Sequence, residues 1–329
     1  MPARPSGPVL VTGADGFIGS HLVEQLVTRG IPVRAFCYYN SNGSYGWLDE
    51  HRDHPGIDFV LGDIRDADFV RQAVDGCSKV FHLAALIAIP YSYEAPDSYV
   101  ETNIRGTLNV LQAVRHHDVD RMVHTSTSEV YGTPDTVPIS ETHALKGQSP
   151  YSASKIAADK MAEAFHSSFE TPVVTVRPFN TYGPRQSTRA VIPTILAQLL
   201  AGRTEVELGS TEPKRDFTYV LDTVQGLIAA GDAAGVEGET IQLGTGVSVS
   251  IAEVFDLACR VTAADAKIRS VEDRQRPPES EVMILLSDPS IAKSKLGWAY
   301  QIDLEEGLAK TAEWIGAHLD LFNVERFHV

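Results

Sequence analysis

Short apolar runs alternate with longer amphipathic segments over the first half of the chain. The runs lie at residues 9–11, 33–36, 58–61, 80–84, 122–124 and 173–176. Between most of them apolar residues recur at helical spacing, as they do at Ile104, Leu108, Leu111 and Val114. Repeated strand and helix units of this kind predict an α/β fold in which helices cover both faces of a parallel sheet.

The pattern becomes looser after Pro178. Loops near residues 182–189, 210–214 and 273–281 alternate with helices predicted at 192–200, 251–262 and 304–318. Residues 217–243 are expected to return to the first sheet. We therefore predict two lobes, the first formed by residues 1–178 and 217–245 and the second by residues 179–216 and 246–329.

Composition and charge narrow the classes of partner. The chain has 329 residues and a formal net charge of −15. This acidic balance argues against nonspecific binding to nucleic acid or to an anionic membrane, since both require a clustered positive field. No apolar segment approaches the roughly 20 residues that span a bilayer, and the start of the chain does not resemble a signal peptide. With three cysteines far apart and no metal-ligand spacing among the histidines, we expect a cytoplasmic protein without a metal site.

A glycine-rich turn follows the first apolar run. Gly13, Gly16 and Gly19 have the Gly-x-x-Gly-x-x-Gly spacing, with Phe17 and Ile18 inside the turn and a helix predicted at 20–29. Such glycines let the backbone turn sharply and approach a pyrophosphate at a helix N-terminus. The position between a strand and a helix predicts dinucleotide binding.

The end of the second predicted strand bears on the choice of cofactor. NAD-binding proteins usually carry an acid there for the ribose hydroxyls, but this chain has Cys37, followed by the candidate contacts Tyr39 and Asn40. The missing carboxylate favours NADP slightly over NAD, although Arg34 lies inside the strand and no clearly placed arginine replaces the acid. After the third strand, Asp63 is a candidate acceptor for the adenine amino group or, alternatively, a turn or helix-capping aspartate.

A tyrosine and a lysine stand one helical turn apart. Tyr151 and Lys155 share one face of a helix that Pro150 can start. A nearby cation favours the phenolate, and a phenolate can remove a proton from a hydroxyl while hydride leaves the carbon. Taken alone, the pair also fits an ordinary solvated helix face.

Together these segments resemble the extended short-chain dehydrogenase/reductase family, in its nucleotide-sugar-modifying branch. The similarity covers nearly the whole chain. It rests on the glycine turn, Asp63-Ile64, residues 82–85, Asn103, residues 125–132, the pair Tyr151 and Lys155, and residues 177–185 and 215–217.

This resemblance implies a doubly wound Rossmann sheet that binds NAD(P) and a smaller C-terminal α/β lobe that binds a nucleoside-diphosphate sugar. It implies a tightly bound cofactor that is regenerated in each cycle, and a homodimer built on a helix bundle. The further cofactor contacts that it implies are Ile64, Leu83, Ala84 and Ala85.

The segment Thr-Ser-Glu-Val-Tyr-Gly at residues 127–132 is similar to nucleotide-sugar 4,6-dehydratases and the related decarboxylases, whereas 4-epimerases usually lack its glutamate. The similarity implies that Thr127 and Tyr151 contact the C4 hydroxyl and that Lys155 holds the nicotinamide ribose. Glu129 would then remove the C5 proton before water leaves from C6. dTDP-glucose dehydratases have an aspartic acid at the position of Ser128, so the proton donor stays open, with Glu129 as an alternative.

Residues 38–41, 86–93, 148–151 and 183–193 resemble the retaining N-acetylglucosamine 4,6-dehydratases of legionaminic acid pathways. This implies UDP-N-acetylglucosamine as the substrate. Arginine suits a diphosphate through its fork of donors. The candidate substrate contacts are Ser92, Asn103, Asn180, Arg185, Val191, Arg215 and Arg276. The alternatives are a nucleotide-sugar 4-epimerase, a UDP-glucuronate decarboxylase and a non-catalytic NAD(P)-sensing protein.

Overall fold

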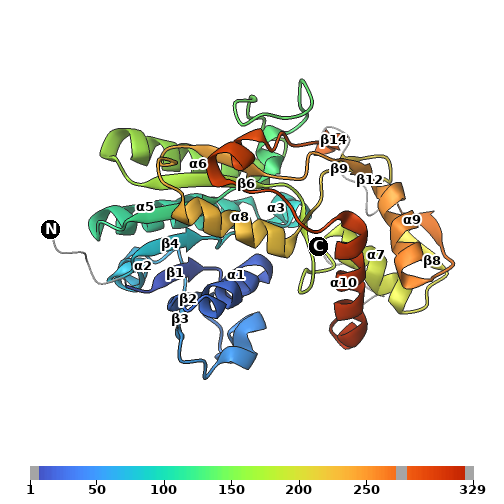
Figure 1. Ribbon diagram of the computed structural model, residues 1–329, viewed down its shortest axis with the longest axis horizontal. Helices are drawn as coiled ribbons and strands as arrows, with labels where there is room; N and C mark the ends of the chain where they lie inside the picture. Colours follow the sequence, from blue (N-terminus) through green and yellow to red (C-terminus); the bar gives the residue numbers. More distant parts are fainter. Residues whose placement is uncertain (1–6, 272–279, 323–329) are drawn as a thin grey trace.

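The computed structural model describes residues 7–271 and 280–322, and its centre is a seven-stranded parallel sheet (Figure 1). The strand order is β11-β6-β5-β4-β1-β2-β3. The strands are β1 (Val9–Thr12), β2 (Val33–Tyr38), β3 (Ile57–Gly62), β4 (Lys79–His82), β5 (Arg121–Thr125), β6 (Val173–Pro178) and β11 (Thr240–Leu243). The predicted α/β fold with a doubly wound parallel sheet is confirmed.

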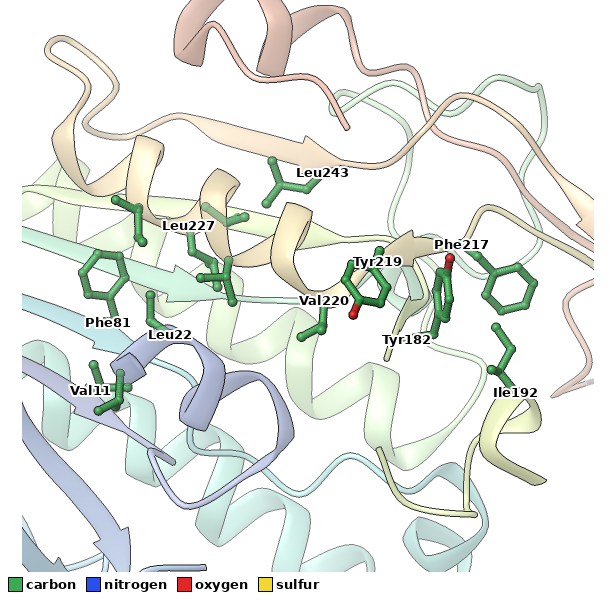
Figure 2. Close-up of a cluster of buried hydrophobic side chains, with 14 of the residues drawn as sticks. Val11, Leu22, Phe81, Tyr182, Ile192, Phe217, Tyr219, Val220, Leu227 and Leu243 are labelled. Atoms are coloured by element: carbon green, nitrogen blue, oxygen red, sulfur yellow. The ribbon is translucent and has the colours of Figure 1, made fainter. Parts of the chain in front are cut away.

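Helices cover both faces of this sheet, as predicted. They are α1 (Phe17–Thr28), α2 (Ala67–Val74), α5 (Gly106–His116), α6 (Pro150–Phe169) and α8 (Val220–Asp232). Alternate residues of a strand face opposite sides. Val11 is therefore buried with α1 and α8, whereas Leu10 is buried with α2, α5 and α6. Figure 2 shows Val11 and Phe81 beside Leu22 of α1 and Leu227 of α8.

Short helical segments connect the longer elements of the first lobe. They are η1 (Gly46–His51), α3 (Ile89–Glu94), α4 (Pro96–Tyr99), η2 (Val100–Arg105) and η3 (Ser128–Tyr131). The segment η2 is a π-helical turn that runs directly into α5. The helix predicted from Asn103 therefore lies on a longer, continuous helical path.

The second lobe combines three helices with small sheets. The helices α7 (Val191–Leu200), α9 (Ile251–Thr262) and α10 (Leu304–Ala317) contact one another, and Figure 1 shows them beyond one end of the large sheet. The other elements are β7 (Thr181–Tyr182), β8 (Glu205–Leu208), β9 (Lys214–Arg215), β10 (Thr218–Tyr219), β12 (Val249–Ser250), β13 (Lys267–Ser270), β14 (Ile284–Leu285), η6 (Ala292–Leu296) and η7 (Leu319–Leu321).

The chain returns to the first sheet after β10. Helix α8 packs on the sheet, and β11 pairs with β6 in parallel register. Near this crossing Tyr182, Phe217 and Tyr219 form edge-to-face aromatic contacts, and Figure 2 shows them next to Ile192 of α7. The boundaries of the two lobes stay a prediction.

Several element boundaries differ from the prediction by one to three residues, and two of them lie at the glycine turn. The fourth strand ends at His82 rather than residue 84, and the N–H groups of Leu83 and Ala84 both bond to the Thr12 side chain. Helix α1 begins at Phe17, inside the glycine turn, rather than at Ser20. Both differences occur at the carboxyl edge of the sheet, where ligands of such folds bind.

Candidate active site

The glycine turn has the backbone geometry of a pyrophosphate site. Gly13 has φ +68°, and a Cβ atom there would lie 2.9 Å from the backbone of Ala84. A Cβ atom on Gly19 would lie 2.0 Å from the carbonyl oxygen of Gly13. No side chain caps the N-terminus of α1 at Gly16. This helix end therefore suits the pyrophosphate of a nicotinamide dinucleotide, with Phe17 and Ile18 in its first turn.

Thr12 holds the segment after β4 above the glycine turn. Its Oγ1 atom accepts hydrogen bonds of 3.2 Å from the N–H groups of Leu83 and Ala84 and lies 2.8 Å from His82 Nδ1. Burial keeps the pKa of His82 well below its usual value, so this imidazole is neutral. The predicted cofactor contacts Leu83, Ala84 and Ala85 are partly exposed at this edge.

The residues after β2 lie in varied surroundings. Cys37 is fully buried, and Tyr39 is 64% exposed. Asn40 closes its own loop, since its side-chain amide donates to the carbonyls of Tyr38 and Ser44 and accepts from the Ser44 N–H. Tyr39 is therefore open to a ligand, while Asn40 supports the loop beside it.

The two residues after β3 are also engaged. The Asp63 carboxylate forms a forked ion pair with Arg65, which lowers the pKa of Asp63. The Ile64 side chain is buried in the core with α2 and α5. If Asp63 bonds to an adenine, its carboxylate serves both the adenine and Arg65. Ile64 can contact a ligand only through its main chain.

Tyr151 and Lys155 do not lie on a solvated helix face. They are 6% and 4% exposed, in the first turns of α6, which Ser149 caps and Pro150 begins. The Lys155 Nζ donates to the carbonyl of Thr125 at 2.7 Å. Burial lowers the pKa of Lys155 to about 8 and raises the pKa of Tyr151.

The segment after β5 brings further polar groups to Tyr151. The Thr127 hydroxyl bonds to the tyrosine side chain and accepts from the Glu129 N–H at 3.2 Å. The charge of Glu129 also raises the pKa of Tyr151, and η3, which carries Glu129, packs against α6. Within residues 7–271 and 280–322 no hydrogen bond or ion pair holds this carboxylate, which is half-buried. Ser128 beside it is buried.

A buried ionic network that sequence reasoning missed lies behind Lys155. The Asp159 carboxylate, one turn further along α6, accepts hydrogen bonds from Ser126 Oγ at 2.8 Å and Arg177 Nη2 at 2.9 Å. His124 Nε2 lies 3.1 Å away. These groups lower the pKa of Asp159 to about 2, and its charge raises the pKa of Lys155. The repeat of polar residues at 151, 155 and 159 was the available signal.

The predicted substrate residues lie in different surroundings. Ser92 and Asn103 are buried and already bonded: Ser92 donates to Ile89 O, and Asn103 bonds to Leu86 and Ser154. They position the loop that follows β4. Arg276 lies outside the described residues.

Asn180 is the predicted residue with the clearest unmet hydrogen-bonding capacity. Its Nδ2 atom is buried just after β6 and has no partner among the residues the structure describes. The Thr125 Oγ1 atom at the end of β5 is also buried and has no hydrogen-bond partner among the described residues. Buried polar atoms rarely lack partners, so both point to a ligand at this edge.

The two described arginines of the set have protein partners. Arg215 is 6% exposed and pairs with Glu281 at 3.0 Å. Arg185 pairs with Glu24 of α1 at 2.7 Å, so its guanidinium lies against the first lobe. Val191 is half-buried at the start of α7.

His, Cys, Asp and Glu form no cluster suited to a metal ion within residues 7–271 and 280–322. The helices of the same ranges include none with the length and apolarity needed to cross a membrane.

Comparisons with known proteins agree on one family. The family described as GDP-mannose 4,6 dehydratase matches residues 10–311. A dTDP-glucose 4,6-dehydratase of Actinoplanes sp. is 34% identical, with 94% of this chain and 98% of the relative covered. A UDP-glucose 4-epimerase of Mycolicibacterium smegmatis is 35% identical, with 93% and 97% covered.

Among solved structures, the dTDP-glucose 4,6-dehydratase DesIV of Streptomyces venezuelae, in a complex that contains NAD, superposes with a TM-score of 0.88. It is 30% identical, with 96% of this chain and 98% of that chain covered. The resemblance to extended short-chain dehydrogenases/reductases is confirmed: this chain belongs to the GDP-mannose 4,6 dehydratase family of nucleotide-sugar enzymes.

Proposed function

We propose that this protein is an NAD(P)-dependent 4,6-dehydratase that converts UDP-N-acetylglucosamine into its 4-keto-6-deoxy product. The observation that carries the proposal is the half-buried Glu129 carboxylate on η3, which packs against the helix of Tyr151; the carboxylate has no partner among the described residues. A base with free lone pairs beside the helix that carries the proposed C4 base suits an elimination across C5 and C6.

Tyr151 and Lys155 serve the first half of the reaction. A nicotinamide cofactor held at the glycine turn would supply the acceptor for the C4 hydride, which would return to C6 after water has left. Tyr151 takes the proton of the C4 hydroxyl, which Thr127 helps to orient. Because burial raises the pKa of Tyr151, the phenolate depends on the positive charge of Lys155 nearby.

Glu129 serves the second half. The C4 ketone makes the C5 proton acidic, and the carboxylate removes it. The C6 hydroxyl then leaves as water. Because Ser128 is buried and carries no acid, Glu129 is the stronger candidate for the proton donor as well.

The identity of the sugar is supported by an apolar wall beside Tyr151. Leu86, Ile89 and Tyr99 pack with Tyr151, and the Tyr93 hydroxyl lies 2.6 Å from Ser280 Oγ of the second lobe. Such a wall suits the methyl group of an N-acetyl substituent. The same proposal includes a homodimer through α5 and α6 and a cytoplasmic location, which suits three unpaired cysteines.

Product mass tests the proposal. The protein is incubated separately with UDP-N-acetylglucosamine, GDP-N-acetylglucosamine, dTDP-glucose, GDP-mannose and UDP-glucuronate. We expect the loss of one water from UDP-N-acetylglucosamine. Glu129→Gln should lose roughly 10²- to 10⁴-fold in rate, the usual contribution of a general base. Glu313→Gln, the same change at an exposed position of α10, is the control and should keep the wild-type rate.

A second candidate is a 4-epimerase, favoured by the similarity to the epimerase of M. smegmatis. An isomer of unchanged mass would establish it and overturn the dehydratase. Loss of carbon dioxide from UDP-glucuronate would identify a decarboxylase, and dehydration by Glu129→Gln at the wild-type rate would contradict the role of that residue. Cofactor binding without turnover of any sugar would favour the sensing protein.

A further inference from the structure

A carboxylate lies at the end of β2 although the strand carries none there. It belongs to Asp15, inside the glycine turn, whose Oδ2 atom accepts a hydrogen bond of 3.3 Å from the Tyr38 N–H. Burial and, less strongly, the charge of Asp15 raise the pKa of the Cys37 thiol, and Tyr38 directly follows that residue. Cys37 occupies the position where an NAD-binding sheet usually carries its acid.

The main chain holds Asp15 from two sides. The Ala14 N–H donates to the carbonyl of Phe36 in β2 at 3.3 Å, and the Trp47 N–H donates to the carbonyl of Asp15 at 3.4 Å. A Cβ atom on Gly46 would lie 3.0 Å from the Asp15 Cβ, so η1 begins directly beside this side chain. The carboxylate therefore has a fixed position between the turn and the strand.

The charges around this position favour a cofactor without a 2′-phosphate. Across the described residues, Asp15 has no Lys, Arg or His in an ion pair with it. The nearest strand arginine, Arg34, pairs with Asp58, and Arg65 pairs with Asp63. A phosphate here would meet an anion without a dedicated cation.

We propose that Asp15 accepts hydrogen bonds from the adenosine ribose hydroxyls and thereby selects NAD over NADP. The acid that the strand lacks is supplied by the turn, which sequence reasoning about β2 alone could not detect. The inference rests on the proposed use of a nicotinamide dinucleotide, and it reverses the preference for NADP expected from Cys37.

Calorimetric titration of the protein, freed of bound nucleotide, with NAD⁺ and with NADP⁺ tests this proposal. We expect wild type to bind NAD⁺ at least about tenfold more tightly, since a charge-assisted hydrogen bond is worth roughly that factor. Asp15→Asn keeps the shape and an acceptor for the Tyr38 N–H but removes the charge. This variant should bind NAD⁺ about tenfold more weakly and should bind NADP⁺ no more weakly than wild type. The two dissociation constants then become similar.

Asp53→Asn is the matched control, because it removes the same charge from an exposed side chain in the segment between β2 and β3. It should leave both dissociation constants unchanged. Equal or tighter binding of NADP⁺ by wild type would overturn the proposal, as would an unchanged ratio in Asp15→Asn. If Asp15→Asn lowers the melting temperature so far that the protein unfolds during the titration, Asp15→Ser provides the same comparison. No sugar nucleotide is present, so a failed dehydratase assay would leave this result intact.

Discussion

Asp159 influences the proposed catalytic lysine from one helical turn away. It is buried with Arg177 and His124, and its negative charge opposes the effect of burial on Lys155. The pKa of Lys155, about 8, therefore reflects two opposing effects: burial lowers it and the Asp159 carboxylate raises it. Asp159 is a positioning residue, since its partners are protein groups.

Replacing Asp159 with Asn should move the alkaline limb of the pH profile of kcat to lower pH. The variant loses the charge that favours the ammonium, so the pKa of Lys155 falls below about 8. The phenolate of Tyr151 then loses its cation at a lower pH than in wild type. The measurement is the rate of dehydration between pH 6 and 10, with Glu313→Gln on α10 as a surface control.

The pH limb separates this role from a purely structural one. Removing one member of a buried ionic network should also cost about 3 kcal/mol of unfolding free energy. A merely structural Asp159 would lower stability and leave the alkaline limb in place, and that outcome would contradict the predicted coupling.

At the residue scale, spacing within one helix placed Tyr151 and Lys155 on the same face of α6. Their role as a catalytic pair stays a prediction that rests on the resemblance to known enzymes. The Asp159 network could not be predicted, because Arg177 lies in the interior of β6 and meets α6 only in the folded sheet. Asp15 was missed for the same reason, since its partner Tyr38 belongs to another strand.

At the scale of elements, the tight packing of the glycine turn against α1 gives a sharp prediction. Gly19→Ala should weaken NAD⁺ binding by about 100-fold or more, because a Cβ 2.0 Å from Gly13 O must displace the turn. Calorimetry with NAD⁺ measures the effect. Gly316→Ala on α10 is the matched control, since no atom lies within 4 Å of its added Cβ, and its affinity should be unchanged. Equal affinity in Gly19→Ala would contradict the proposed pyrophosphate site.

The same packing explains which boundaries the sequence could predict. The centres of the six predicted strands and of the longer helices were confirmed, because their apolar periodicity is strong. The end of β4 was displaced, since it depends on hydrogen bonds to Thr12 and on the close approach of Gly13 to Ala84. The start of α1 was displaced because the helix begins within the glycine turn. The two-residue strands of the second lobe are too short to carry a period.

At the scale of the whole molecule, Arg185 joins the two lobes. Its backbone has φ +71°, and its guanidinium reaches Ser20 Oγ at 3.1 Å and Glu24 Oε1 at 2.7 Å. Next to it, His21 Nε2 lies 3.1 Å from the Pro184 carbonyl. The resemblance to known enzymes implied that Arg185 binds the substrate diphosphate, but the sequence could not show an ion pair that spans so much of the chain.

The contacts of Arg185 favour a bridge between the lobes, and two variants can separate the roles. If the guanidinium mainly holds Glu24, Arg185→Ala and Glu24→Gln should each lower the free energy of unfolding by about 1 kcal/mol, and the double variant should lose less than the sum. The KM for the sugar nucleotide should then stay within about twofold, equivalent to less than 0.5 kcal/mol of binding. Urea unfolding and initial rates supply both readouts. A diphosphate ligand would behave differently: Arg185→Ala alone would raise KM tenfold or more, because Glu24→Gln leaves the arginine charge in place.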